Sequence, residues 1–168
     1  MPQAVVHVIF TIIAIDLFRD YVVKDKRKIP LSFIFLGGVA GLLPDVDIPL
    51  FWLVKHALGM EVEWFHRTFS HSLVVVAALI LITLLVYRWK EKWGILAAII
   101  TFGVSFHIFL DFIFVGYIMP FYPFSSVTAG LDILSRTGLE AAAAGFDAII
   151  LLAWLWHEEK KHRISDFI

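Results

Sequence analysis

Long uncharged apolar runs, separated by short charged blocks, dominate the chain. Five runs cover residues 4–20, 31–54, 72–87, 94–118 and 139–156. Each approaches the roughly 20 residues that a helix needs to cross a bilayer, although the first and third are short. Strands are disfavoured because an isolated strand cannot satisfy its backbone hydrogen bonds in lipid. The pattern therefore predicts an all-α, polytopic membrane bundle of about five transmembrane helices, forming a single integral membrane domain over residues 1–168.

The second apolar run has an internal break. Pro44 and Pro49 bracket Asp45 and Asp47, and glycines precede them at 37, 38 and 41. Proline removes a backbone donor and kinks or ends a helix. Non-helical backbone at membrane depth is tolerated where it is buried in protein or lines a wet cavity. We therefore expect the two aspartates to lie in a helix break near Pro44–Pro49.

The basic residues predict the orientation. Five crossings place eleven of them on one side and three on the other, and the richer side is expected to be cytoplasmic. The N-terminus is then outside and the C-terminus cytoplasmic, in a multi-pass protein of the inner or plasma membrane. The cytoplasmic set is Arg19, Lys24, Lys26, Arg27, Lys28, Arg88, Lys90, Lys92, Lys160, Lys161 and Arg163; the outer set is Lys55, Arg67 and Arg136.

Composition agrees with a membrane protein and narrows its partners. Apolar residues make up 60% of the 168, charged residues only 17%, and the mean hydropathy is +0.85. The lipid bilayer is the expected partner. A net charge of −1 supplies no basic field for nucleic acid. With no cysteine present, disulfides and thiolate metal sites are excluded.

Histidines and aspartates gather at the outer end of this predicted topology. At 1.5 Å per residue, both Asp45 and His107 lie roughly 20 Å from the cytoplasmic ends of their helices. Imidazole and carboxylate ligands suit Zn²⁺, and also Mn²⁺ or Fe²⁺. Each ionisable group at this depth costs about 2.5–3.5 kcal/mol, which metal binding would offset. The predicted metal ligands are His7, Asp45, Asp47, His66, His71, His107 and Asp111.

Spacing supports the grouping but leaves alternatives open. His107 and Asp111 are four residues apart on one helix face, which suits a ligand pair and equally an intrahelical hydrogen bond. Asp45 and Asp47 are candidate ligands or the catalytic base, and Asp47 alternatively caps a helix or supports a histidine. His7 is either a ligand or a packing residue. Ser70, between His66 and His71, is a candidate N-cap for the third helix.

Arg67 adds a candidate catalytic group beside the histidines. A guanidinium next to a metal can grip phosphate through paired hydrogen bonds, whereas the alternative role is an anchor to lipid phosphate at the interface. A serine nucleophile at Ser70 is less favoured because the chain has no Gly-x-Ser-x-Gly elbow. No His-Glu-x-x-His motif is present, which disfavours a zincin-type protease.

Four short motifs, in order behind His7, together resemble a known family. They are Leu42-Leu43-Pro44-Asp45-Val46-Asp47, His66-Arg67-Thr68-Phe69-Ser70-His71-Ser72, His107-Ile108-Phe109-Leu110-Asp111 and Tyr122-Pro123-Phe124. The family is that of the membrane-bound metal-dependent hydrolases, also described as LexA-binding, inner-membrane-associated hydrolases (YdjM-like). The resemblance covers roughly residues 1–125.

That family is distantly similar to zinc-dependent phospholipase C and P1 nuclease. The resemblance implies one site built from Asp45 or Asp47, His66 or His71, His107 and Asp111, and a second from His7 with a bridging Asp111. Met1 stands where those enzymes bind metal through an N-terminal Trp, and no further His-x-x-x-Glu or Asp helix completes a third site. We therefore expect one or two ions.

The leading hypothesis is a metal-dependent phosphoester hydrolase at the extracytoplasmic face, acting on a phospholipid, a lipid-linked phosphate or a small phosphate ester. Metal would bring the pKa of water toward 7, and Asp45, Asp47 and Arg67 are the candidate catalytic residues. An alternative is a metal-ion or proton transporter, for which Asp16 would continue the path; otherwise Asp16 is part of a polar pair. A third is a structural membrane protein stabilised by a metal.

Overall fold

The computed structural model describes residues 4–23, 26–57, 59, 66–138 and 140–162, and throughout these residues the regular structure is helical. The only strand-like pairing among them is an isolated antiparallel bridge between Ile118 and Ala129. The all-α prediction is confirmed for this part of the chain. Leu139, the first residue of the predicted fifth span, and Lys24 and Arg163 of the basic set lie outside the described residues.

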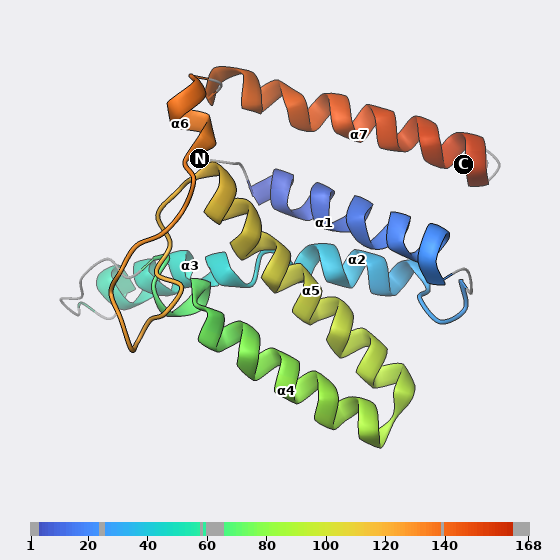
Figure 1. Ribbon diagram of the computed structural model, residues 1–168, viewed down its shortest axis with the longest axis horizontal. Coiled ribbons are helices and arrows are strands. Elements are labelled where there is room, and N and C mark those ends of the chain that lie inside the picture. Colours follow the sequence, from blue (N-terminus) through green and yellow to red (C-terminus); the bar gives the residue numbers. More distant parts are fainter. Residues whose placement is uncertain (1–3, 24–25, 58, 60–65, 139, 163–168) are drawn as a thin grey trace.

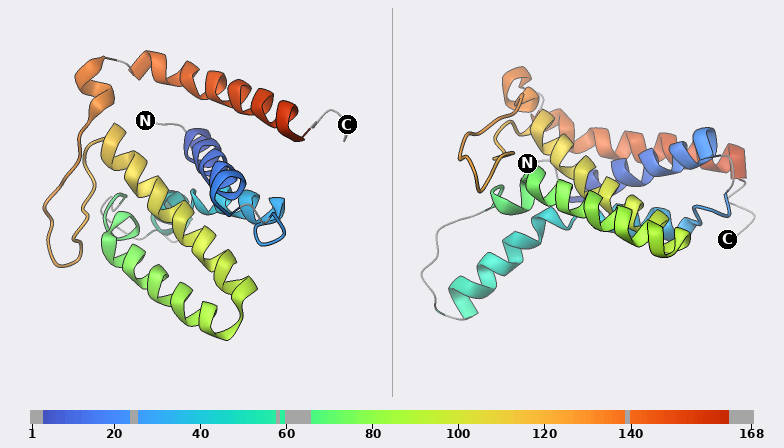
Figure 2. Two further views of the ribbon diagram at one scale, coloured as in Figure 1. Left: turned by 45° about the vertical axis from the view of Figure 1, so that its right-hand side comes forward. Right: turned by 60° about the horizontal axis from the view of Figure 1, so that its bottom comes forward.

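The first half of the chain forms two packed helices and a projecting arm (Figures 1 and 2). Helix α1 spans Ala4–Phe18 and continues as the π-helical turn η1, Arg19–Val23. Helix α2 spans Leu31–Ala40 and is followed by the 3-10 turn η2, Pro44–Val46. The arm consists of α3, Asp47–Trp52, and the π-helical turn η3, Leu53–Ala57. Figure 2 shows it pointing away from the bundle in the right-hand view.

The second half contains the longest helices. The 3-10 turn η4, Phe69–His71, leads into α4, Leu73–Trp89, which turns sharply into α5, Glu91–Phe114. A long connection follows, and then the short α6, Ile133–Thr137, and α7, Glu140–His162. Helix α5 packs against α4, α2 and α1, and α7 lies along α1. Helix α5 is therefore the central helix of the bundle.

Successive long helices run alternately between two ends of the molecule (Figure 1). Helices α1, α4 and α7 start at the end that carries α6, and α2 and α5 run back toward it. We call this end the site end, because the predicted ligands lie there, and the other the far end. The break in the second run is confirmed, since α2 and the following η2–η3 unit are bent by 46°.

Among the described residues, one helix is long and apolar enough to cross a membrane, Glu91–Phe114, or two if the bent pair Leu31–Ala40 and Pro44–Ala57 is counted as one span. Helix α4 is apolar but shorter. It buries none of its residues, and Leu81, Leu84 and Leu85 are each more than 50% exposed. The fourth run ends at Phe114 rather than at residue 118, because the chain turns at Gly116, whose φ is +83°.

A close helix crossing fixes the position of α2 on α5. A Cβ atom on Gly103 would lie 2.4 Å from the backbone oxygen of Gly37, so only glycine allows this approach. Ile15, Phe33, Ile34 and Ile99 pack around the crossing as one buried cluster with Ile29, together with partly buried apolar residues of α1, η1 and α5. The crossing brings the C-terminal end of α2 against the face of α5 that carries His107.

Candidate metal centre

All seven predicted ligands lie at the site end and lie close to one another. His7 comes from the first turns of α1, the two aspartates from the break after α2, His66 and His71 from the segment before α4, and His107 with Asp111 from the last turns of α5. His71 and His107 are completely buried, Asp111 is 1% and His7 2% exposed. The predicted convergence of four separate segments is therefore what the fold brings about.

The backbone of α2 determines how His107 is protonated. Nδ1 of His107 lies 2.6 Å from the carbonyl oxygen of Gly41. A carbonyl can only accept a hydrogen bond, so Nδ1 carries a proton, and in the neutral tautomer that a metal ligand requires Nε2 keeps its lone pair. The glycine crossing described above sets the carbonyl at this distance. The glycine crossing of α2 on α5 thus leaves Nε2 of His107 available to donate its lone pair to a metal ion.

Ser70 and Asp47 determine how His71 is protonated. The hydroxyl of Ser70 lies 2.5 Å from Oδ2 of Asp47 and 2.9 Å from Nδ1 of His71. An ionised carboxylate only accepts, so Ser70 donates its single proton to Asp47. Nδ1 of His71 must then donate to the serine oxygen. Nε2 of His71 is left with a lone pair, like that of His107.

These two lone pairs face each other. Nε2 of His71 lies 3.2 Å from Nε2 of His107, and neither nitrogen has a proton to offer the other. Oδ1 of Asp45 lies 3.4 Å from Nε2 of His107 and 3.6 Å from Nε2 of His71. With both imidazoles neutral, three electron-rich atoms so placed repel one another, and a cation between them relieves this repulsion.

The three separations match those of ligands around one ion. Nitrogen and oxygen ligands about 2.0–2.1 Å from a tetrahedral Zn²⁺ lie roughly 3.3 Å from each other. A further carboxylate oxygen, Oδ2 of Asp111, lies 3.6 Å from Nε2 of His71. The residues present therefore fit a divalent metal with Asp45, His71 and His107 as its core ligands.

The formal charges of the site also favour a bound divalent cation. With the histidines in the neutral form that metal ligands require, Asp45, Asp47 and Asp111 contribute three negative charges and Arg67 one positive charge, which leaves two negative charges in a largely buried site. Uncompensated buried charge is strongly unfavourable. One divalent cation would bring the site to neutrality. Burial also lowers the pKa of His71, which keeps its imidazole neutral and able to donate a lone pair.

His7 and Asp111 form the second part of the cluster. The imidazole of His7 stacks on that of His107 with 3.9 Å between ring centroids, and its Nε2 lies 3.5 Å from Oδ1 of Asp111. Nδ1 of His7 is buried and has no hydrogen-bond partner among the described residues. The ligand atoms of His7, His107 and Asp111 lie within 4.8 Å of one another. Both ring nitrogens of His107 already have a role, so a second ion bridged through Asp111 would have His7 as its further ligand among these three residues.

Arg67 is a partner of Asp111 and is not exposed at a lipid surface. Its Nε donates to Oδ2 of Asp111 at 3.0 Å, its guanidinium lies 5.1 Å above the ring of Tyr117, and it is only 7% exposed. This burial speaks against the alternative of a headgroup anchor. The backbone of Arg67 has a φ of +64°, which is uncommon for a residue with a side chain.

Asp47 lies further than Asp45 from the two facing Nε2 atoms. It accepts hydrogen bonds from Nδ1 of His66 at 2.8 Å and from Ser70. Its contact with His71 Nδ1 is longer, 3.8 Å. Asp47, His66 and His71 also have ligand atoms within 4.8 Å of one another. The geometry favours Asp47 as the residue that positions two histidines.

One local prediction was wrong, and the structure gives Ser70 different partners. The N-cap of α4 is Ser72, whose hydroxyl accepts from the backbone N–H of Val75 at 3.4 Å, and not Ser70. Ser70 is instead the link between Asp47 and His71. Sequence reasoning also missed the Gly41 carbonyl and Tyr117. Their partners lie far away in sequence, and no local pattern indicates such contacts.

Residues 1–164 match the family that is described as YdjM inner membrane protein. The chain belongs to the YdjM inner membrane protein family. The part of the predicted resemblance that names this family is confirmed, and so is the location in a membrane. Comparison with curated proteins gave no match, and neither did comparison with solved structures.

A second polar cluster of this YdjM-family chain lies at the far end, where α1 meets α7. Arg19 pairs with Asp16 at 2.6 Å and with Asp20 at 3.1 Å, and Lys161 pairs with Asp20 at 2.9 Å. The hydrogen bond from Lys161 to Asp20 raises the pKa of Lys161. The buried Glu158 is a third acidic residue of this cluster, and the ligand atoms of Asp16, Asp20 and Glu158 lie within 4.8 Å of one another. Arg19 and Lys161 both pair with acidic groups here, as expected for polar pairs.

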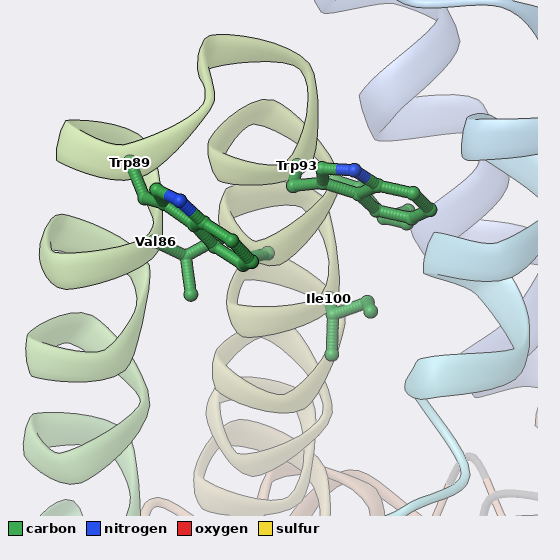
Figure 3. A pocket seen from close by; sticks show the side chains of 6 residues that line it. Val86, Trp89, Trp93 and Ile100 are labelled. Atoms are coloured by element: carbon green, nitrogen blue, oxygen red, sulfur yellow. The ribbon is translucent and has the colours of Figure 1, made fainter.

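An open apolar groove of about 490 Å³ also lies at the far end, at the turn between α4 and α5 (Figure 3). Val86, Trp89, Trp93 and Ile100 are among its lining residues, and none of the lining side chains is ionisable. In a membrane protein, aromatic residues at helix ends form a belt at the interface. We therefore attribute this groove to contact with lipid and not to chemistry.

Proposed function

We propose that this YdjM-family chain is a metal-dependent hydrolase of phosphoesters that works at the extracytoplasmic face of the membrane. The observation that carries the proposal is the pair of imidazole lone pairs 3.2 Å apart, with a carboxylate oxygen at 3.4 and 3.6 Å. Structural zinc sites are closed, whereas catalytic sites keep an open position. Asp45 is the most exposed of the core ligands, with 25% of its side chain accessible, and it gives the site an open side.

Zinc is the first choice of ion because the donors are imidazoles and carboxylates, with Mn²⁺ or Fe²⁺ as alternatives. Such an ion supplies Lewis acidity toward water and toward a phosphate oxygen. In the overall reaction, water forms a bond to phosphorus, the ester P–O bond breaks, and the leaving alcohol takes up the proton. Asp45 is the accessible carboxylate and therefore the candidate to accept the proton of the attacking water.

Arg67 has two possible contributions to this reaction. Its guanidinium orients Asp111 through Nε, and the same positive charge lies where it can offset charge that develops on phosphate. Arg67→Lys keeps the charge but loses the planar fork. In the proposed enzyme this variant should keep its metal and lose most of its kcat, whereas loss of the metal would assign Arg67 to the support of Asp111 alone.

The proposal is tested by comparing His107→Ala with His56→Ala in purified protein. His56 is an exposed histidine that stacks on Trp52 at 4.3 Å and takes no part in the cluster. The experiment measures bound Zn²⁺ by elemental analysis and the turnover of a panel of phosphoesters. We expect His107→Ala to lose metal and activity together and His56→Ala to keep both. Wild-type protein that holds zinc but turns over no phosphoester would overturn the enzymatic part.

A further inference from the structure

The connection between α5 and α6 exposes apolar side chains where a soluble loop would be polar. Phe124 is 84% exposed, Val127 62% and Phe121 55%. No charged residue occurs anywhere from residue 112 to residue 131. Large exposed apolar side chains gathered in one segment are typical of an interaction site.

The base of this segment is a fixed structure. Ile118 and Ala129 exchange both backbone hydrogen bonds, at 3.1 and 2.9 Å, and the N–H of Leu131 donates to the oxygen of Phe112 at 2.8 Å. A Cβ atom on Gly130 would lie 2.3 Å from the backbone of Gly116, so these two backbone segments cross too closely for any side chain at residue 130. The exposed aromatic residues are therefore held in place by the fold.

The segment is also tied to the metal centre. The N–H of Met119 donates to the carbonyl oxygen of Arg67 at 3.2 Å, and the N–H of Leu73 donates to that of Pro120 at 2.8 Å. The ring of Tyr117 packs under the guanidinium of Arg67, which in turn holds Asp111. Any surface that the segment contacts is consequently at a fixed position relative to the metal centre.

The position of the segment indicates what it contacts. It begins directly after Phe114, the last residue of α5, which is the helix long and apolar enough to cross the membrane. The segment thus lies where the lipid-facing surface of α5 ends, at the depth of headgroups and first acyl carbons. Aromatic residues are enriched at this depth in membrane proteins. The absence of charge over twenty residues suits lipid better than the polar rim of a protein partner.

We propose that residues 115–131 dock into the interface of the bilayer and hold the metal centre at headgroup level, so that its substrate is a phosphoester carried on a lipid. The docking part stands on the surface alone, and the choice of substrate rests on the proposed function. Hydrolysis follows the balance given above: water adds to phosphorus, and the lipid or headgroup alcohol leaves with the proton.

Docking is tested by spin labelling, because the chain contains no cysteine that would interfere. Phe124→Cys, Leu84→Cys and Lys90→Cys are labelled with a nitroxide in liposomes of phosphatidylethanolamine and phosphatidylglycerol. Relaxation by oxygen and by water-soluble chromium oxalate then reports depth. We expect the label at 124 to be protected from chromium oxalate, as at the lipid-facing position 84. Full accessibility, as at the turn residue 90, would overturn docking, and protection that appears only as protein density rises would instead indicate a second copy.

The substrate is tested with a double variant, Phe121→Ser with Phe124→Ser, against the control Trp89→Ser at the far end. Two probes are compared, phosphatidylglycerol in vesicles and soluble bis(p-nitrophenyl) phosphate. We expect the double variant to lose roughly tenfold in turnover of the vesicle lipid, with zinc content and turnover of the soluble ester unchanged. Equal loss on both probes, or on neither, would overturn the lipid-substrate proposal and leave a metal-dependent hydrolase. If the wild-type protein turns over neither probe while the label at 124 is protected, the proposed hydrolase function fails and the docking proposal stands.

Discussion

His71 and His107 point their Nε2 atoms at each other across 3.2 Å, and each has its other ring nitrogen bonded to an acceptor. Two neutral imidazoles normally avoid this arrangement, because lone pair faces lone pair. The fold enforces it from both sides, through the Gly41 carbonyl on α2 and through the Ser70 hydroxyl before α4. Second partners of this kind fix the tautomer and the orientation of metal-binding histidines.

The role of Ser70 leads to the first prediction. Ser70→Ala removes the group that holds Nδ1 of His71, and loss of such a partner typically weakens metal binding by about 10–100-fold. Ser70→Thr keeps a hydroxyl and should restore most of the affinity. Ser105→Ala is the matched control, since the Ser105 hydroxyl donates within α5, to the oxygen of Thr101 at 2.7 Å. Competition with a fluorescent zinc chelator measures the affinity. Unchanged zinc binding in Ser70→Ala would contradict the view that Ser70 links Asp47 to His71 and orients its ring.

The two aspartates of the break should behave differently. Asp45 contacts both facing nitrogens, whereas Asp47 bonds to His66 and Ser70. We expect Asp45→Asn to lose zinc during purification, and Asp47→Asn to retain zinc with an affinity about 10–100-fold lower. Elemental analysis before and after dialysis against a chelator distinguishes the two. The reverse order of effects would make Asp47 the ligand.

The glycine crossing of α2 on α5 has a predicted energetic consequence. A side chain at residue 103 would collide with the backbone of Gly37, and forced overpacking costs about 1–3 kcal/mol. We expect Gly103→Val to lower the melting temperature in detergent. Gly145→Ala on α7 is the control, because nothing lies within 4 Å of its added Cβ atom. An unshifted melting temperature for Gly103→Val would show that the helices can separate at this point without cost.

Five crossings predict opposite sides for two exposed lysines. Lys28 precedes α2 at the far end, and Lys55 lies on the arm beyond the helix break. With five spans, the excess of basic residues predicts that the far end is cytoplasmic. In intact cells, a membrane-impermeant maleimide should label Lys55→Cys directly and Lys28→Cys only after permeabilisation. Labelling of both from the same side would reject the five-span topology.

Some of the fold could be predicted because the length of apolar runs and the spacing of polar residues are local properties of the sequence. Apolar runs indicated the helices, and the distance of His107 and of Asp45 from the cytoplasmic ends of their helices indicated a common depth. The end of α5 could not be predicted, because residues 115–118 are as apolar as a span and differ only in the turn at Gly116. Hydropathy does not distinguish an aromatic interfacial loop from the last turn of a helix.

The ligand types could be predicted for a related reason, whereas their roles could not. Imidazoles and carboxylates are chemically distinctive, so their grouping at one depth is visible in the sequence. The assignment of Asp45 and Asp47 to different roles depends on contacts between residues that are 19 or more positions apart in the sequence. The same holds for Arg67, whose partner Asp111 follows 44 residues later.

The central claim is that a cation lies between His71, His107 and Asp45. Anomalous diffraction from zinc-loaded crystals, with data collected on both sides of the zinc absorption edge, tests it most directly. We predict a zinc peak bounded by the two Nε2 atoms and Oδ1 of Asp45, about 2.0–2.2 Å from each. A map without a peak there, or with its zinc at Asp16, Asp20 and Glu158 at the far end instead, would contradict the account.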